Sequence, residues 1–124
     1  MITGIGIDMI EVDRISKRVN NDNGFKEKVF SQREISYCEL SGNKAQNYAA
    51  RFAAKEAFLK ATGAGLTLSY ELHEIEVITD EAGKPGIELT GGYKELSITK
   101  NWNHIYLSLS HLRSVACAVV IIEE

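Results

Sequence analysis

The sequence has little cysteine and no long hydrophobic run. Its 124 residues include two cysteines, Cys38 and Cys117, which are too few and too far apart for a disulfide framework or a zinc site with clustered ligands. No apolar run approaches the roughly 20 residues that span a bilayer, and the amino terminus lacks the basic flank and hydrophobic region of a signal peptide. The sequence therefore predicts free thiols, no membrane partner and a cytoplasmic protein.

Charge is nearly balanced overall, with a formal net charge of −3, but it is uneven along the chain. Basic residues outnumber acidic ones between residues 14 and 33. A local basic face on a mildly acidic protein suits an acidic protein partner or a phosphate-rich ligand better than nucleic acid, for which a basic domain is expected. Solvated helix faces would explain the same charges.

The hydrophobic periodicity predicts one domain over residues 1–124, with an α+β fold in which a mostly antiparallel sheet packs against a long central helix. The predicted strands cover residues 2–10, 74–79, 86–89, 104–110 and 114–122. The predicted helices begin near residue 11, at the Ser31/Glu34 capping box, and at residues 44 and 92; the third is the long one and ends at Thr62 before Gly63.

The long helix carries a carboxylate where a hydrophobic residue is expected. Its apolar stripe is formed by Ala49, Phe52 and Leu59; Glu56 falls on this stripe, with Lys60 at the edge. A carboxylate among apolar neighbours needs a positive charge. Lys60, a basic side chain from elsewhere, or a metal shared with a second carboxylate could supply it, and a plain Glu56–Lys60 ion pair is the commonest of these arrangements.

Asp8 is the candidate for that second carboxylate. It comes late in the first strand, where Ile5 and Ile7 alternate with glycines, so we expect another backbone to approach the glycine side closely. Asp8 could hold a metal together with Glu56, or it could cap the helix that begins near Glu11. Spacing alone leaves both possibilities open.

Two oxygen ligands without a histidine or cysteine cluster favour a hard ion, and Mg²⁺ is usually held by one or two carboxylates together with substrate phosphates. The same helix carries Arg51 and Lys55, which we expect to stand free on a neighbouring face and to bind phosphate oxygens with Lys60. The residues therefore predict a Mg²⁺-assisted reaction on a phosphoanhydride.

The penultimate strand ends in a polar cluster. Ser108 and Ser110 share one strand face, and His111 lies at the strand end. Taken alone, a solvated sheet face and a turn histidine explain these residues better than a functional site does.

Several blocks together resemble the holo-acyl-carrier-protein synthases, the small bacterial 4′-phosphopantetheinyl transferases. The blocks are Gly4-Ile5-Gly6-Ile7-Asp8 with Arg14, Phe30-x-x-x-Glu34-x-x-Tyr37, Arg51 to Ala57 with Lys60 and Gly63-x-Gly65, Gly83-Lys84-Pro85, and Ser108 to His111. They occur in the right order over nearly the whole chain. Each block is weak alone, but the helix block combined with the Asp8 block is highly specific.

The resemblance implies the 4′-phosphopantetheinyl transferase fold. It also implies transfer of 4′-phosphopantetheine from coenzyme A (CoA) to a serine of apo-acyl carrier protein, which releases adenosine 3′,5′-bisphosphate and serves fatty acid biosynthesis. Asp8 and Glu56 are expected to bind Mg²⁺, with the CoA pyrophosphate completing its coordination. The residues expected to bind CoA are Arg51, Lys55, Lys60, Gly63, Gly65, Pro85, Ser108, Ser110 and His111.

The expected catalytic residues are Asp8, Glu56, Lys60 and His111. The general base is either Glu56, acting through a metal-bound water, or His111. Neither the residues nor the resemblance chooses between these two.

The resemblance further implies that Arg14, Lys17 and Arg18 dock the acidic carrier protein, whose charge suits electrostatic steering. It also implies a homotrimer with active sites at the subunit interfaces. Two other functions remain open. One is a Mg²⁺-dependent nucleotide phosphohydrolase, and the other is a non-catalytic module that binds CoA or a carrier protein, in which Glu56 merely pairs with Lys60.

Overall fold

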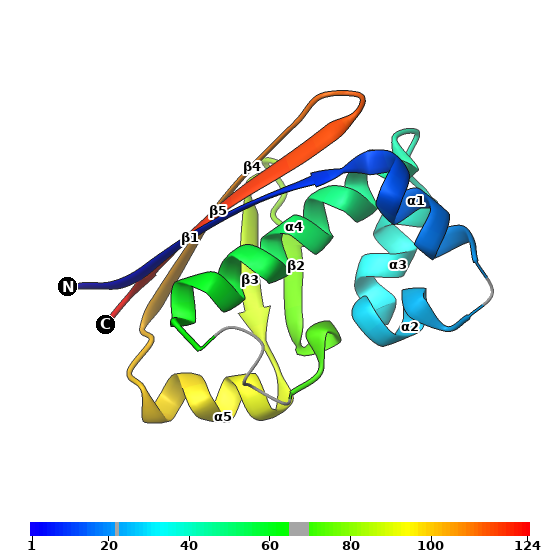
Figure 1. The fold of residues 1–124 in the computed structure, drawn as a ribbon. Helices are drawn as coiled ribbons and strands as arrows, with labels where there is room; N and C mark the ends of the chain where they lie inside the picture. Colours follow the sequence, from blue (N-terminus) through cyan, green and yellow to red (C-terminus); the bar gives the residue numbers. More distant parts are fainter. Residues whose placement is uncertain (22, 65–69) are drawn as a thin grey trace.

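The computed structural model describes residues 1–21, 23–64 and 70–124. The elements in chain order are β1 (Ile2–Glu11), α1 (Val12–Asn20), α2 (Phe25–Val29), α3 (Gln32–Glu39), α4 (Lys44–Thr62), the 3₁₀ turn η2 (Leu72–Glu74), β2 (Ile75–Thr79), β3 (Pro85–Leu89), α5 (Gly91–Thr99), β4 (His104–His111) and β5 (Val115–Glu123) (Figure 1). No helix among the described residues is long and apolar enough to cross a bilayer.

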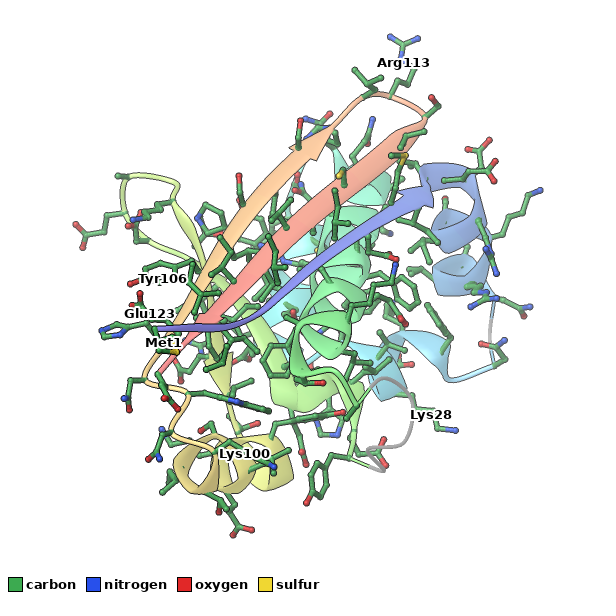
Figure 2. The ribbon with its side chains drawn as sticks, turned by 60° about the vertical axis from the view of Figure 1, so that its left-hand side comes forward. Met1, Lys28, Lys100, Tyr106, Arg113 and Glu123 are labelled. Carbon is green, nitrogen blue, oxygen red and sulfur yellow. The ribbon has the colours of Figure 1, made fainter. Side chains whose placement is uncertain are left out.

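The strands form two antiparallel sheets, one with the order β1-β5-β4 and the other made of β2 and β3. In the first sheet, the β4–β5 hairpin carries Arg113 at its tip, at the opposite end from Tyr106 and Glu123 (Figure 2). Met1 lies at that opposite end, and its ammonium group donates to the Glu124 carbonyl oxygen at 3.3 Å. Two small sheets therefore replace the single sheet that the sequence predicted.

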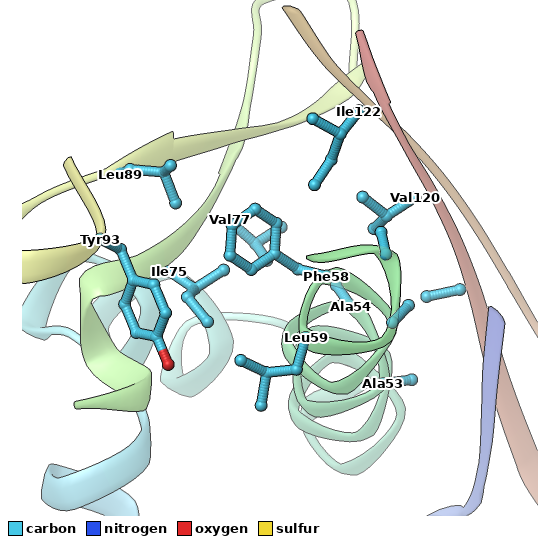
Figure 3. Close-up of a cluster of buried hydrophobic side chains, with 13 residues drawn as sticks. Ala53, Ala54, Phe58, Leu59, Ile75, Val77, Leu89, Tyr93, Val120 and Ile122 are labelled. Carbon is cyan, nitrogen blue, oxygen red and sulfur yellow. The ribbon is translucent and has the colours of Figure 1, made fainter. Parts of the chain in front are cut away.

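Helix α4 lies between the two sheets and forms the centre of the molecule (Figure 1). Its Phe58 side chain points into the core between Val120 and Ile122 of β5 and the β2 residues Ile75 and Val77 (Figure 3). All of these side chains are buried. Because α4 has sheet on both sides, most of its length is covered, and few of its residues reach solvent.

Two glycines allow β1 to contact the backbone of α4. A Cβ atom built on Gly4 would lie 1.8 Å from the Ala61 carbonyl oxygen, and one built on Gly6 would lie 2.0 Å from the Ala57 carbonyl oxygen. The predicted close approach on the glycine side of the strand is therefore confirmed. Asp8 follows on the same face of β1, so its side chain is directed towards α4.

The short helix α2 was not predicted from the sequence. The stretch before it is rich in asparagine and ends at Gly24, which takes the left-handed conformation, with φ 82°. The helix is held by packing, because Val29 is buried and the Phe25 ring lies edge-on to Phe30 with a centroid separation of 6.3 Å. A helix this short depends on tertiary contacts, which periodicity does not reveal.

Candidate active site

A pocket of about 330 Å³ opens where β1, α1 and α4 meet. Each element contributes a different kind of group: β1 supplies one carboxylate, α4 supplies a second carboxylate and an aromatic ring, and α1 supplies two guanidinium groups. The lining residues are Asp8, Met9, Ile10, Arg14, Arg18, Phe52 and Glu56. Both residues expected to bind metal and two of the three expected to dock a partner therefore share one pocket, whereas Lys17 is exposed outside its lining.

Asp8 does not cap α1, because that helix begins after Glu11. Its carboxylate instead accepts a hydrogen bond from Lys60 Nζ at 3.1 Å, and the same ammonium group donates to the Ile7 carbonyl oxygen at 3.0 Å. Lys60 thus neutralises Asp8. The simple Glu56–Lys60 ion pair is not the pair that forms.

Glu56 is half-buried, and no hydrogen bond or ion pair ends on its carboxylate within the described part of the chain. Burial raises the pKa of Glu56 above its ordinary value, the nearby charge of Asp8 raises it further, and Lys60 lowers it. Two carboxylates directed into one pocket attract a cation, and their oxygen atoms suit a hard divalent ion.

The carboxylates alone do not complete a metal site. No group of three or more histidine, cysteine, aspartate or glutamate side chains is gathered among residues 1–21, 23–64 and 70–124. A Mg²⁺ ion commonly keeps several waters and takes oxygen ligands from substrate phosphates. The donor set of Asp8 and Glu56 fits that use.

Lys55 is not the free cation expected from the sequence. Its side chain is fully buried, and Nζ donates to Glu34 Oε1 at 2.8 Å and to the carbonyl oxygens of Leu72 and Ile75. The sequence placed Glu34 in the block Phe30-x-x-x-Glu34-x-x-Tyr37 and in the capping box with Ser31, and the structure confirms the capping box. The spacing gave no sign that this carboxylate also binds Lys55.

Arg51 is not free either, because only 3% of its surface is exposed. Its guanidinium group stacks on the ring of Tyr37, with Cζ 4.2 Å from the ring centroid, and Nη2 donates to Thr79 Oγ1 at 3.4 Å. Of the three cations expected to bind phosphate, Lys60 alone is exposed beside the two carboxylates. The expectation of two free cations failed because α4 is covered on nearly every side.

The serines of β4 lie on the other face of the sheet from Asp8. Asp8 pairs in register with Ala118 of β5, whose side chain is buried, whereas Ser108 and Ser110 are exposed and pair with Val119 and Cys117. Strand β5 separates β4 from β1. A single chain therefore does not bring these hydroxyls to the two carboxylates.

The remaining residues expected to bind CoA are dispersed. His111 is exposed at the end of β4, and Pro85 begins β3 in the second sheet. Gly63 ends α4 with a φ of 76°, as predicted from its position. Gly65 lies outside the described residues.

Both cysteines are free, as predicted. Burial raises the pKa of the Cys38 thiol to about 11. A buried thiol with so high a pKa is a poor nucleophile, which agrees with a packing role.

Residues 4–120 match the profile of the 4′-phosphopantetheinyl transferase superfamily. The chain belongs to this superfamily. The holo-[acyl-carrier-protein] synthase of Cytophaga hutchinsonii is 45% identical to it over 130 aligned residues, which cover 100% of this chain and 99% of that protein. The corresponding synthase of Syntrophus aciditrophicus is 44% identical, with 99% and 97% covered.

Solved structures of the family share the fold. The Neisseria meningitidis holo-[acyl-carrier-protein] synthase superposes with a TM-score of 0.91 at 28% identity, over 100% of both chains. The Helicobacter pylori enzyme, solved in complex with coenzyme A, superposes with a TM-score of 0.84 at 32% identity, over 96% of this chain and 99% of that one. The predicted α+β fold is confirmed, and the chain is a phosphopantetheinyl transferase of the holo-acyl-carrier-protein synthase type.

Proposed function

We propose that this enzyme transfers the 4′-phosphopantetheine arm of CoA to a serine hydroxyl of an apo-acyl carrier protein. The reaction depends on Mg²⁺, releases adenosine 3′,5′-bisphosphate and prepares the carrier for fatty acid biosynthesis. The observation that carries the proposal is the pocket in which Asp8 and Glu56 lie beside Arg14 and Arg18. The relatives named holo-[acyl-carrier-protein] synthase and the CoA complex of the Helicobacter pylori enzyme support it.

Asp8 and Glu56 would hold the Mg²⁺, which when bound neutralises charge on the CoA pyrophosphate and on the leaving bisphosphate. Lys60 is the exposed ammonium group next to Asp8 and supplies a point charge for a phosphate oxygen. We assign Arg51 and Lys55 to holding α4 in place, because both are buried inside the chain.

Within a single chain, Glu56 is better placed than His111 to accept the proton of the carrier serine. It lines the pocket, whereas His111 is exposed at the far strand of the sheet. Burial and the charge of Asp8 raise the pKa of Glu56, which brings this carboxylate closer to the range that suits a general base at neutral pH.

The acidic carrier protein would dock on α1. Arg14 and Arg18 line the pocket, and the Arg18 guanidinium carbon lies 5.7 Å from the centroid of the Phe25 ring. Guanidinium groups pair with carboxylates through two parallel hydrogen bonds. Carboxylates on the carrier surface would therefore be held at the rim of the pocket, with Lys17 adding to the attraction.

The outer face of the first sheet supports the proposed homotrimer. Ile5, Ile7 and Met9 of β1 are 67%, 57% and 65% exposed. They lie beside Ile121, Val119 and Cys117 of β5, so the part of this face formed by β1 and β5 is apolar. Such a face marks an interaction surface. Burying it against a second copy could bring the β4 serines and His111 of one chain to the pocket of another.

Intact-mass measurement of an apo-acyl carrier protein tests the transferase directly. The carrier is incubated with this protein, CoA and Mg²⁺, and a parallel sample contains a chelator. We expect the carrier to gain the mass of one phosphopantetheine group only when Mg²⁺ is free. Consumption of CoA without a carrier would instead indicate a phosphohydrolase, and binding without any turnover would indicate a non-catalytic module.

A further inference from the structure

A buried ion pair lies on α4 next to the pocket but does not face it. Lys55 precedes Glu56 in the chain, and its side chain and that of Glu34 are both 0% exposed, with Nζ and Oε1 2.8 Å apart. The proposed chemistry uses neither residue. Both belong to blocks that stand out in the sequence, and nothing in the pocket explains them.

The pair connects three elements. The three ammonium hydrogens of Lys55 reach Glu34, the Leu72 carbonyl oxygen at 3.1 Å and the Ile75 carbonyl oxygen at 2.5 Å. The Glu34 carboxylate also accepts from the backbone N–H groups of Ser31 and Val77, each at 2.9 Å. Helix α4 is thereby tied to the start of α3 and to the segment around β2.

Burying two charges costs free energy, and a well-packed apolar pair is often at least as stable. What the ion pair adds is a defined orientation of the Lys55 side chain. An ammonium group with three fixed acceptors is satisfied in one orientation only. Because these acceptors belong to other elements, they fix the rotation of α4 about its own axis.

That rotation determines where Glu56 points. Successive helix residues are about 100° apart, so the contact of Lys55 with α3 and β2 directs Glu56 towards β1. A rotation of about 10° would move a side-chain end that lies 5–6 Å from the helix axis by about 1 Å. A displacement of that size at a reacting centre can cost about 100-fold in rate.

The contact of α4 with the glycines of β1, on the opposite side of the helix, has a different effect. Gly4 and Gly6 allow the α4 backbone to lie against β1, which sets the distance between the two carboxylate-bearing elements. The Glu34–Lys55 pair sets the rotation of α4 about its own axis. Together the two contacts define the position of Glu56 relative to Asp8.

We propose that Glu34 and Lys55 are positioning residues, which hold α4 at the rotation that directs Glu56 and Asp8 to the same cation. This inference rests on the proposed metal role of Glu56. It concerns the orientation of the helix and not its presence, so its test must separate loss of metal binding from loss of stability.

The main variant is the double substitution Glu34→Gln/Lys55→Met, which removes both charges and leaves neither partner buried alone. Glu34→Asp is the second variant, because it keeps both charges but draws the carboxylate back by one methylene group. The control is Leu89→Ala, a buried position on β3 away from the pocket. Mn²⁺ binding in the presence of CoA is measured by electron paramagnetic resonance, with Glu56→Gln defining the part of the signal due to this site.

We expect both Glu34 variants to bind Mn²⁺ at least about tenfold more weakly, as is typical when the residues supporting a metal ligand are lost. Where transfer is measured, kcat should fall about 100-fold while KM for the carrier protein changes little. Leu89→Ala should lower the thermal midpoint and leave Mn²⁺ affinity unchanged. If Glu34→Asp binds Mn²⁺ as tightly as the wild type, the positioning proposal is wrong.

The metal measurement keeps this proposal separate from the proposed function. Wild-type transfer together with unchanged Mn²⁺ affinity in the Glu34 variants would overturn the positioning role alone. A wild type that transfers nothing, but whose Glu56-dependent Mn²⁺ binding weakens in those variants, would overturn the transferase and support the positioning role. Absence of any Glu56-dependent Mn²⁺ binding in the wild type would overturn the positioning role as stated.

Discussion

At the scale of single residues, the ionised form of Glu56 that would bind a metal also lowers the stability of the folded protein. Its pKa is raised by burial and by Asp8, so the folded state favours the protonated carboxyl group. Protonated Glu56 therefore contributes its whole stabilising effect at pH values below its pKa in the unfolded chain, about 4.3. This contribution is lost as the pH rises through the pKa of Glu56 in the folded protein. At neutral pH, the ionised carboxylate destabilises the metal-free protein.

Glu56→Gln should therefore raise the unfolding free energy of the metal-free protein at pH 7, by less than about 1 kcal/mol because the group is only half-buried. The gain should vanish near pH 3.5, where both states of the wild type are largely protonated. Thermal unfolding with chelator present at the two pH values measures this. A variant less stable than the wild type at pH 7 would show that Lys60 outweighs the other two effects.

The pKa of Glu76 is shifted in the opposite direction from that of Glu56. A hydrogen bond from Arg33 lowers the pKa of Glu76, and a second hydrogen bond from Ser31 acts in the same direction, against the effect of burial. The folded pKa is below the unfolded value, so this contribution to stability is present above about pH 4.3 and is lost as the pH falls through the folded pKa.

Glu76→Gln should cost about 1.5–3 kcal/mol of unfolding free energy at pH 7, the range for a hydrogen bond to a charged group. Urea unfolding at pH 7 and near pH 3 should show the difference shrinking at the lower value. Glu88→Gln is the matched control, since Glu88 is 3.4 Å from the same arginine but half-exposed, and it should cost less than about 0.5 kcal/mol. Equal losses in both variants would contradict the assigned roles.

Some residues of the pocket and of α4 could be assigned from the sequence, and others could not. Asp8 and Glu56 could be found because each breaks a hydrophobic or glycine pattern, and the pocket brings both together. Lys55 and Arg51 could not be assigned correctly. Periodicity identifies an exposed face only when a helix has one, and α4 is covered on nearly every side.

At the scale of elements, the contact between β1 and α4 determines whether the pocket exists. Gly6→Ala would place a Cβ atom 2.0 Å from the Ala57 carbonyl oxygen and 2.7 Å from the Ala61 amide nitrogen. Both are backbone atoms and cannot turn aside. We expect a loss of about 3 kcal/mol or more in urea unfolding, together with loss of transfer.

The control for this substitution is Gly42→Ala. A Cβ atom there would meet nothing within 4 Å, and the position has no left-handed φ. The variant should unfold within about 0.5 kcal/mol of the wild type. If Gly6→Ala were equally mild, the close packing of β1 on α4 would be disproved.

Most elements could be predicted because each has its own local signal. The capping box at Ser31 begins α3, and Gly63 ends α4, both as expected. The division of the strands into two sheets could not be predicted from the sequence, because the pairing of β1 with β5 joins residues at opposite ends of the chain. Long-range pairing leaves no trace in local periodicity.

At the scale of the whole molecule, the exposed apolar face of the first sheet predicts assembly. Ile5→Lys places a charge in that face at a position that is 67% exposed in the single chain. We expect analytical ultracentrifugation to show a smaller species than the wild type. The unfolding free energy of the isolated chain should change by less than about 0.5 kcal/mol.

Leu40→Lys is the matched control for this substitution. Leu40 is 89% exposed at the end of α3, a helix that belongs to neither sheet. It should leave the assembly unchanged. A wild type that sediments as a monomer, or an Ile5→Lys variant that assembles normally, would contradict the interfacial site.

The central claim is that the carboxylates of Asp8 and Glu56 together support transfer. The most direct measurement is the rate of carrier modification at saturating CoA as a function of Mg²⁺ concentration, for Asp8→Asn, Glu56→Gln and the exposed control Glu95→Gln on α5. We predict that the transfer rate falls at least about 1,000-fold in each of the first two variants, with folding intact and the control unchanged. A Glu56→Gln enzyme within about tenfold of the wild-type rate, with the same Mg²⁺ dependence, would contradict it.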